Sequence, residues 1–187
     1  MKLKKIFFVG CGAVGFALLE IMKRERLYYN CQFTLIEPRD IADISAVMTG
    51  RKYTHVKERM TRENYSSLLK DVDPSSLIVN VSVNVDSIML LQFCKEKKAL
   101  YVDTSLEQYQ DYSHTNPTEV ERYSEFKKNN LYHQQLEAEK VTQHAKRSMA
   151  VSSGFNPGYI SEFAKKALVE YAKTKGKRLV KNNYAKL

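Results

Sequence analysis

The segment KIFFVGCGAVGFALLEIMKR, residues 5–24, decides the fold. Its apolar start predicts a short buried strand over Lys4–Val9, broken by a glycine. Apolar residues at helical spacing then predict a helix over Ala13–Arg24. Gly10, Gly12 and Gly15 lie at this junction in the pattern G-x-G-x-x-G. The pattern alone is weak, but a position after a strand and before a helix is the context that gives it meaning.

Each of the three glycines has a separate task in a dinucleotide site. Gly10 allows the tight turn from strand to helix, and Gly15 lets the helix pack closely on the sheet. Gly12 has no side chain, so a pyrophosphate can approach the backbone amides at the start of the helix. The alternative is a tight strand-to-helix turn that binds no ligand.

The end of the second predicted strand, Gln32–Ile36, supplies an independent check. Glu37 follows that strand and lies 22 residues after Gly15, close to the ~20 residues expected for a carboxylate that holds the adenosine ribose. Its charge disfavours the extra phosphate of NADP, so NAD is the predicted cofactor. Arg39 weakens this preference without reversing it, because an arginine can accommodate that phosphate.

The rest of the chain continues the alternation of short apolar strands and helices. This alternation predicts a Rossmann-type, doubly wound α/β fold, with a mostly parallel sheet and helices on both faces. We expect this domain over residues 1–172 and a basic tail over 173–187. The polar stretch Gln108–Pro117 is predicted to line or cover a site. The further strands are expected over Tyr53–Val56, Leu77–Val81, Ala99–Val102 and Met149–Ser152, and the further helices over Ile41–Met48, Asn64–Leu69, Val85–Lys97, Tyr132–His144 and Tyr159–Ala172.

Composition narrows the class of protein. The 187 residues carry a net charge of +9, and most of the excess lies from Lys165 onward. A solvated basic tail is therefore favoured over a nucleic-acid-binding surface. Three cysteines with no C-x-x-C pair indicate a reducing compartment, so we expect a cytoplasmic protein. No stretch is long and apolar enough to span a membrane, and no spacing suggests a metal site.

Several motifs together resemble the homospermidine synthases, within the saccharopine dehydrogenase-like group. The resemblance covers nearly the whole chain, from about Lys4 to Ala172. Its most specific parts are the Asp-Thr…Glu segment and the Asn-Pro-Gly segment. The motifs that carry it are Gly10–Gly15, Glu37-Pro38, Asn80–Val83, Ala99–Thr104 with Glu107, and Gly154-Phe155-Asn156-Pro157-Gly158.

The resemblance implies an NAD-dependent oxidoreductase and aminobutyl transferase that acts on a putrescine-like polyamine. An amine is oxidised to an imine, an aminobutyl group is transferred, and the new imine is reduced by the NADH just formed. Glu107 and Asn156 are then expected on the catalytic side, because a polyamine cation needs negative charge nearby. The residues implied to border the cofactor are Gly10, Gly12, Ala13, Val14, Gly15, Glu37, Ser82, Asp103, Thr104, Asn156 and Pro157.

The chain departs from the family pattern in two places. Ser153 and Phe155 stand where the family usually has a histidine or cysteine and an alanine. The resemblance also implies a second domain beyond Leu187, so this chain is expected to be the N-terminal cofactor domain. Two alternatives remain open, a non-catalytic NAD-binding module and a saccharopine dehydrogenase-like reductase of an amino acid-derived imine. A homo-oligomer also remains open.

Overall fold

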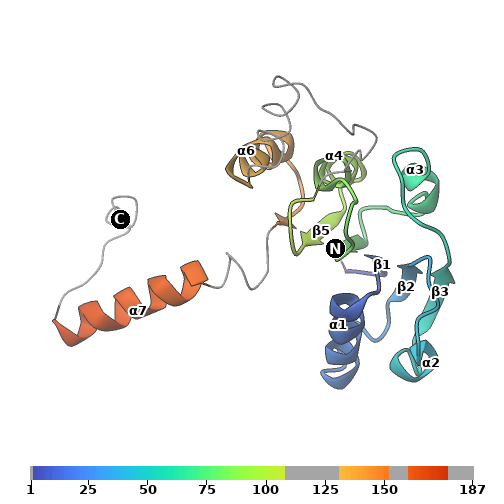
Figure 1. Cartoon of the computed structure of the whole chain (residues 1–187), viewed down its shortest axis with the longest axis horizontal. Coiled ribbons are helices and arrows are strands. Elements are labelled where there is room, and N and C mark those ends of the chain that lie inside the picture. Colours follow the sequence, from blue (N-terminus) through green and yellow to red (C-terminus); the bar gives the residue numbers. More distant parts are fainter. Residues whose placement is uncertain (1, 108–130, 152–159, 177–187) are drawn as a thin grey trace, which may run out of the picture. The chain divides into compact units, whose positions relative to one another are not determined.

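The computed structural model describes residues 2–107, 131–151 and 160–176 (Figure 1). Its centre is a six-stranded sheet in which every neighbouring pair of strands is parallel, in the order β3-β2-β1-β4-β5-β6. This is the strand order of a doubly wound dinucleotide-binding fold, so the predicted fold class is confirmed. The strands are β1 (Lys5–Val9), β2 (Gln32–Ile36), β3 (Lys52–Val56), β4 (Ser76–Asn80), β5 (Leu100–Asp103) and β6 (Met149–Ala150).

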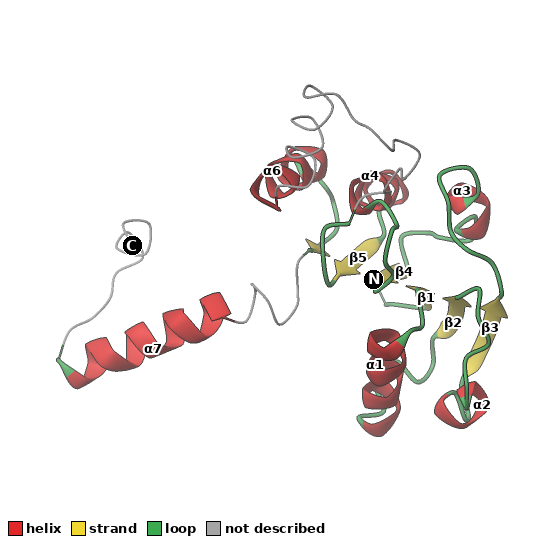
Figure 2. Cartoon of the chain, viewed as in Figure 1, coloured by secondary structure: helices red, strands yellow, loops and turns green. Residues whose placement is uncertain are grey.

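Helices cover both faces of the sheet (Figure 2). Helices α1 (Ala13–Arg24) and α2 (Ile44–Val47) lie on one face, and α3 (Tyr65–Leu68), α4 (Ser87–Lys97) and α6 (Leu131–Thr142) lie on the other. Strand β1 is buried on both sides because its residues alternate between the two cores. Ile6 and Phe8 pack with α1 and α2, while Phe7 and Val9 pack with α3, α4 and α6.

Two short helices differ from their predicted bounds. Helix α2 begins at Ile44 rather than at Ile41, because Asp43 adopts a left-handed conformation with φ of +53°. Helix α3 begins after Asn64, whose side chain accepts a hydrogen bond from the Thr61 amide and does not cap the helix. The helix that lies against the cofactor motif has the predicted bounds.

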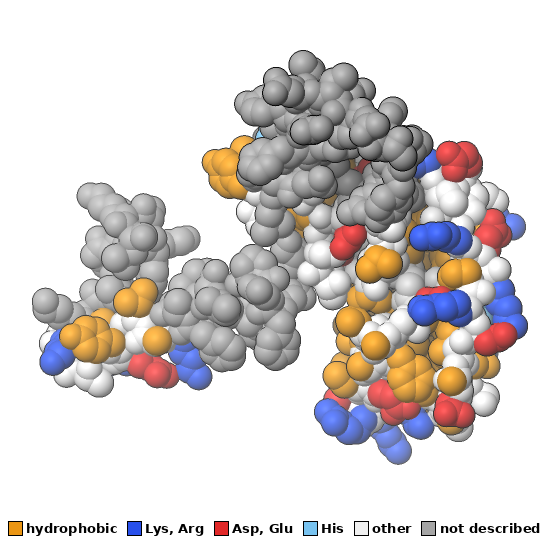
Figure 3. Space-filling view, viewed as in Figure 1, with side chains coloured by type: hydrophobic (Ala, Val, Ile, Leu, Met, Phe, Trp, Pro, Cys, Tyr) orange, Lys and Arg blue, Asp and Glu red, His pale blue; other side chains and the backbone are white. Residues whose placement is uncertain are grey.

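The chain divides into two compact units, Met1–Val151 and Ser152–Leu187. The second contains α7 (Ile160–Thr174). A cofactor domain that extends to residue 172 stays a prediction. On the face drawn in Figure 3, acidic and basic side chains intermingle over the first unit. None of the helices in the described part of the chain has the length and apolarity needed to cross a membrane.

Candidate functional site

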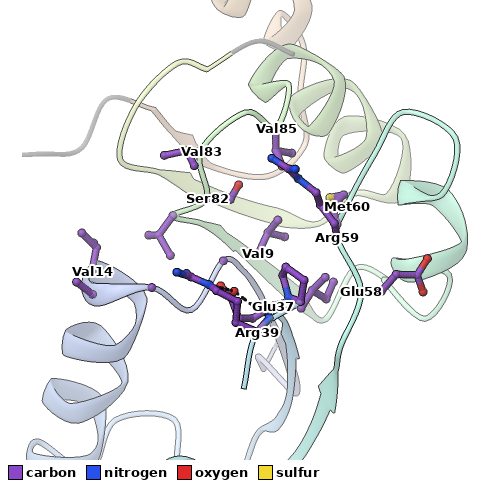
Figure 4. Close-up of a pocket in the computed structure, with 16 residues that line it drawn as sticks. Val9, Val14, Glu37, Arg39, Glu58, Arg59, Met60, Ser82, Val83 and Val85 are labelled. Carbon is purple, nitrogen blue, oxygen red and sulfur yellow. Dashed lines mark hydrogen bonds and ion pairs between the residues drawn. The ribbon is translucent and has the colours of Figure 1, made fainter. Parts of the chain in front are cut away.

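A cleft of about 610 Å³ lies at the carboxyl ends of β1, β2 and β4 (Figure 4). The strand order reverses between β1 and β4, and this is where open parallel sheets of this kind bind ligands. The cleft is lined by Val9, Gly10, Gly12, Ala13, Val14, Ile36, Glu37, Pro38, Arg39, Glu58, Arg59, Met60, Val81, Ser82, Val83 and Val85.

The glycine turn forms the floor of the cleft. Gly10 has a φ of +84°, and a Cβ atom there would lie 2.7 Å from the Cα atom of Ser82. At Gly15 a Cβ atom would lie 2.7 Å from the carbonyl oxygen of Gly10, so this glycine lets α1 approach the turn. Gly12 differs, because the nearest atom to a Cβ there is a guanidinium nitrogen of Arg39 at 3.5 Å. Gly10 and Gly15 are therefore required by packing, whereas the space above Gly12 is open to the cleft.

The start of helix α1 is suited to an anion. Gly12 is the N-cap residue and provides no side chain to the first turn of the helix. The first backbone N–H groups of a helix lack partners within the helix and carry the positive end of its dipole. Ala13 and Val14 line the cleft at this point. The residues present thus fit a pyrophosphate, as the motif predicts.

Glu37 supplies the cleft with a buried carboxylate, only 5% exposed. Its Oε2 accepts a hydrogen bond of 3.0 Å from the Cys11 N–H. Its Oε1 accepts from the Arg39 side chain at 2.8 Å and from the Arg39 backbone N–H at 3.2 Å. Burial alone raises the pKa of Glu37, but these hydrogen bonds outweigh it and the net pKa is lowered. The carboxylate is therefore ionised at neutral pH and can accept from ribose hydroxyls.

Two arginines face the same region. The side chain of Arg39 is 74% exposed, so its ion pair with Glu37 is readily rearranged. Arg59 is also exposed and has no hydrogen-bond or ion-pair partner for its guanidinium among the described residues. Glu58, Arg59 and Met60 also line the cleft and were not predicted from the sequence. Their position just after the predicted strand Tyr53–Val56 could have indicated that they line the cleft. The carboxyl ends of parallel strands meet at one edge of the sheet.

A buried hydrogen-bond network supports the β4 side of the cleft. The carboxylate Oδ2 of Asp103 accepts from the hydroxyls of Tyr101 and Ser87, each at 2.6 Å, and from the Asn80 amide at 3.1 Å. The Asn80 carbonyl oxygen in turn accepts from the hydroxyl of Ser82 at 2.6 Å. The network thus connects the end of β5 to a residue that lines the cleft.

Asp103 is 1% exposed and does not line the cleft, although it is among the residues implied to border the cofactor. Burial raises the pKa of Asp103, and the hydrogen bonds from Ser87, Tyr101, Ser105 and Asn80 oppose that rise. The neighbouring Thr104 is exposed, and its backbone N–H donates to Asn80 at 3.4 Å. A direct contact of either residue with the cofactor stays a prediction.

Glu107, expected on the catalytic side, lies beside the start of α4. Its carboxylate accepts from the Asn84 N–H at 3.3 Å and from the Ser105 hydroxyl at 3.5 Å. Its backbone is paired with Ser87 in both directions. These contacts fix the loop that follows β4. Asn156, Pro157 and the stretch Gln108–Pro117 lie outside the described residues.

Known proteins resemble this chain in sequence and in fold. Homospermidine synthase of Mesorhizobium japonicum is 25% identical over 171 residues, and that of Blastochloris viridis is 26% identical over the same length. Each alignment covers 89% of this chain, but only 34% and 35% of the respective relative. The chain therefore spans about a third of the length of these curated relatives.

A solved structure agrees in fold. Homospermidine synthase from Legionella pneumophila, crystallised in complex with NAD, superposes with a TM-score of 0.71 at 21% identity. The match covers 96% of this chain and 35% of that protein. Residues 6–151, which contain the cleft and all of the sheet except the first residue of β1, match the saccharopine dehydrogenase NADP binding domain. The chain therefore belongs to the family of the saccharopine dehydrogenase NADP-binding domains.

Proposed function

We propose that this chain is the NAD-binding part of a homospermidine synthase-type oxidoreductase. The observation that carries the proposal is the open backbone at Gly12 beside the buried, ionised carboxylate of Glu37. Backbone N–H donors for a pyrophosphate and an acceptor for ribose hydroxyls thus lie in one cleft. The NAD complex of the Legionella relative supports the choice of cofactor.

The residues of the chain bind and orient the dinucleotide, which supplies hydride transfer when bound. Glu37 holds the adenosine ribose and disfavours a phosphate on it. The start of α1 holds the pyrophosphate through backbone donors. On this proposal the adenosine half lies over β2 and the nicotinamide half towards β4.

The substrate of the proposed enzyme is a putrescine-like polyamine, as the names of the curated relatives suggest. On this proposal Glu107 and Asn156 face the substrate. A cationic polyamine gains from such a carboxylate, which replaces part of its hydration. Three free, buried cysteines are in keeping with a reducing compartment such as the cytoplasm.

Calorimetric titration with NAD and with NADP tests the cofactor proposal. We expect tighter binding of NAD, and we expect Gly12→Ala to weaken binding of both. A chain that binds neither dinucleotide contradicts the proposal.

The substrate is tested by titrating putrescine into the NAD-saturated protein while the absorbance of reduced cofactor is followed. A response that Glu107→Gln removes, with NAD binding unchanged, supports an enzyme. NAD binding without a putrescine response supports the second candidate, a cofactor-binding module.

A further inference from the structure

Among the described residues that line the β4 side of the cleft, only Ser82 has a polar side chain. Its neighbours in the lining there are Val81, Val83 and Val85. Figure 4 shows Ser82 on the loop that follows β4, which also carries Val83 and Val85. Any polar contact that a bound dinucleotide makes with a side chain of this stretch therefore involves Ser82. Which way its hydroxyl points then decides which part of the ligand it can hold.

The hydroxyl hydrogen of Ser82 is already used inside the protein. It is donated to the Asn80 Oδ1 at 2.6 Å, and the Ser82 backbone N–H donates to the same oxygen at 3.3 Å. A backbone N–H can only donate, so the atom that faces it must be the carbonyl oxygen of the Asn80 amide. The Asn80 nitrogen therefore points the other way.

Asp103 imposes the same orientation from the opposite side. The Asn80 nitrogen lies 3.1 Å from the Asp103 Oδ2, an atom that also accepts from Tyr101 and Ser87. A flipped amide would place an oxygen against this carboxylate and a nitrogen against the Ser82 N–H. Both changes leave buried polar groups without partners, which is costly. Two independent groups thus fix the amide and, through it, the hydroxyl.

With its hydrogen used internally, Ser82 presents only oxygen lone pairs to the cleft. A phosphate at neutral pH has only acceptor oxygens towards such a group, so Ser82 is unsuited to the pyrophosphate. A ribose hydroxyl can donate to it. Because Glu37 lies at the opposite end of the cleft, over β2, the ribose near β4 is the second one.

We propose that Ser82 accepts a hydrogen bond from a hydroxyl of the nicotinamide ribose. Asn80 and Asp103 act as positioning residues that hold Ser82 in this orientation. The inference rests on the proposed function, because it requires a dinucleotide in the cleft. It also gives Asp103 a role that its burial permits, in place of direct contact with the cofactor.

The test compares ADP, ADP-ribose and NAD, because ADP lacks the second ribose and ADP-ribose lacks the nicotinamide. In Ser82→Ala we expect ADP affinity to stay unchanged and the affinities for ADP-ribose and NAD to fall about 3-fold to 10-fold, for the loss of one neutral hydrogen bond. Ser66→Ala, on the exposed side of α3, is the matched control and should change none of the three.

Other outcomes overturn the assignment. Equal weakening of ADP would mean that Ser82 contacts the phosphates. Weakening of NAD alone would assign the hydroxyl to the nicotinamide group. Unchanged ADP-ribose affinity would show that Ser82 holds no ribose. A wild-type chain that binds no nucleotide at all would instead overturn the proposed function.

The positioning role of Asp103 has its own readout. Asp103→Leu, which has no acceptor for the Asn80 amide, should lower the ratio of ADP-ribose to ADP affinity by as much as Ser82→Ala does. The double variant should lower this ratio no further, because both changes remove one interaction. If Asp103→Leu lowers the two affinities equally, its role is structural only. Ser82→Ala keeps the proposal testable if the Asp103 variant does not fold.

Discussion

Replacing each of the three glycines by alanine should separate what the fold needs from what the ligand needs. The methyl group at residue 10 would meet the Ser82 backbone at 2.7 Å, in a conformation with φ of +84°. The left-handed conformation costs about 1–2 kcal/mol for a residue with a side chain, and the overlap adds roughly 1–3 kcal/mol. Gly10→Ala should therefore destabilise the protein by about 2–5 kcal/mol.

The other two positions should behave differently. At residue 15 the overlap with the Gly10 carbonyl oxygen is partly offset by the roughly 1 kcal/mol that alanine gains over glycine within a helix. At residue 12 the backbone φ is −67°, which any residue adopts, and the nearest atom is 3.5 Å away. The free energy of unfolding should thus fall moderately for Gly15→Ala and by less than about 1 kcal/mol for Gly12→Ala.

For Gly12→Ala we expect a large loss of NAD affinity although the loss of stability is small. A methyl group there occupies the space through which a pyrophosphate reaches the first amides of α1. The loss of one charge-assisted hydrogen bond corresponds to roughly a 10-fold to 100-fold loss of NAD affinity. Among the three variants, this one alone should combine near-normal stability with defective binding.

Thermal unfolding and calorimetric titration of the same preparations measure both effects. A destabilisation of 2–5 kcal/mol lowers the Tm by roughly 5–15 °C in a chain of this size. If Gly12→Ala keeps wild-type NAD affinity, the pyrophosphate does not lie where the turn predicts. If Gly10→Ala keeps the wild-type Tm, the Gly10 backbone does not lie as close to Ser82 as described.

Three further predictions concern charged and thiol groups. Arg39→Ala should weaken NADP binding about tenfold or more while leaving NAD binding nearly unchanged, because only NADP has a phosphate that can draw this arginine from Glu37; equal losses in titrations of both would contradict this. The pKa of Asp73 is lowered from 3.8, chiefly by hydrogen bonds from Lys5 and Ser75. The pKa of Asp73 is lower in the folded protein than in the unfolded chain. The stabilisation by its carboxylate is therefore present above the unfolded pKa and is lost as pH falls through the folded pKa. The Tm difference between wild type and Asp73→Asn should therefore shrink below about pH 4. A difference that does not change with pH would show that the Asp73 carboxylate charge is not the source of the stabilisation. Burial, followed by the charge of Glu37, raises the pKa of Cys11 to about 12, so iodoacetamide at pH 8 should label it only after unfolding; rapid labelling of the folded protein, located by peptide mapping, would refute its burial.

Local sequence signals predicted the elements around the cofactor motif well. The bounds of α1 and β2 agree with prediction because glycine, and glutamate followed by proline, punctuate the chain at these points. The bounds of the short helices α2 and α3 were less accurate. Their starts depend on a left-handed aspartate and on a side-chain hydrogen bond, neither of which has a periodic pattern.

The polar network behind the cleft could not be read from local patterns. Asn80 and Asp103 become partners because β4 and β5 pair in a register that places these two residues opposite each other. Sequence spacing predicts that two strands exist but not which residues face one another. For the same reason the bonds of the Asp103 oxygens to four internal donors could not be predicted from the sequence.

The hydrogen-bond acceptors and donors along the described cleft follow the order of the chemical groups in a dinucleotide. Glu37 offers an acceptor at the β2 end, the start of α1 offers donors in the middle, and Ser82 offers an acceptor at the β4 end. A dinucleotide presents ribose hydroxyls, then phosphate oxygens, then ribose hydroxyls, and these partners can bind them in this order. An inorganic anion or a mononucleotide would contact only some of these three groups. The three groups therefore favour a dinucleotide over smaller ligands, and the glycines place them within reach of one another.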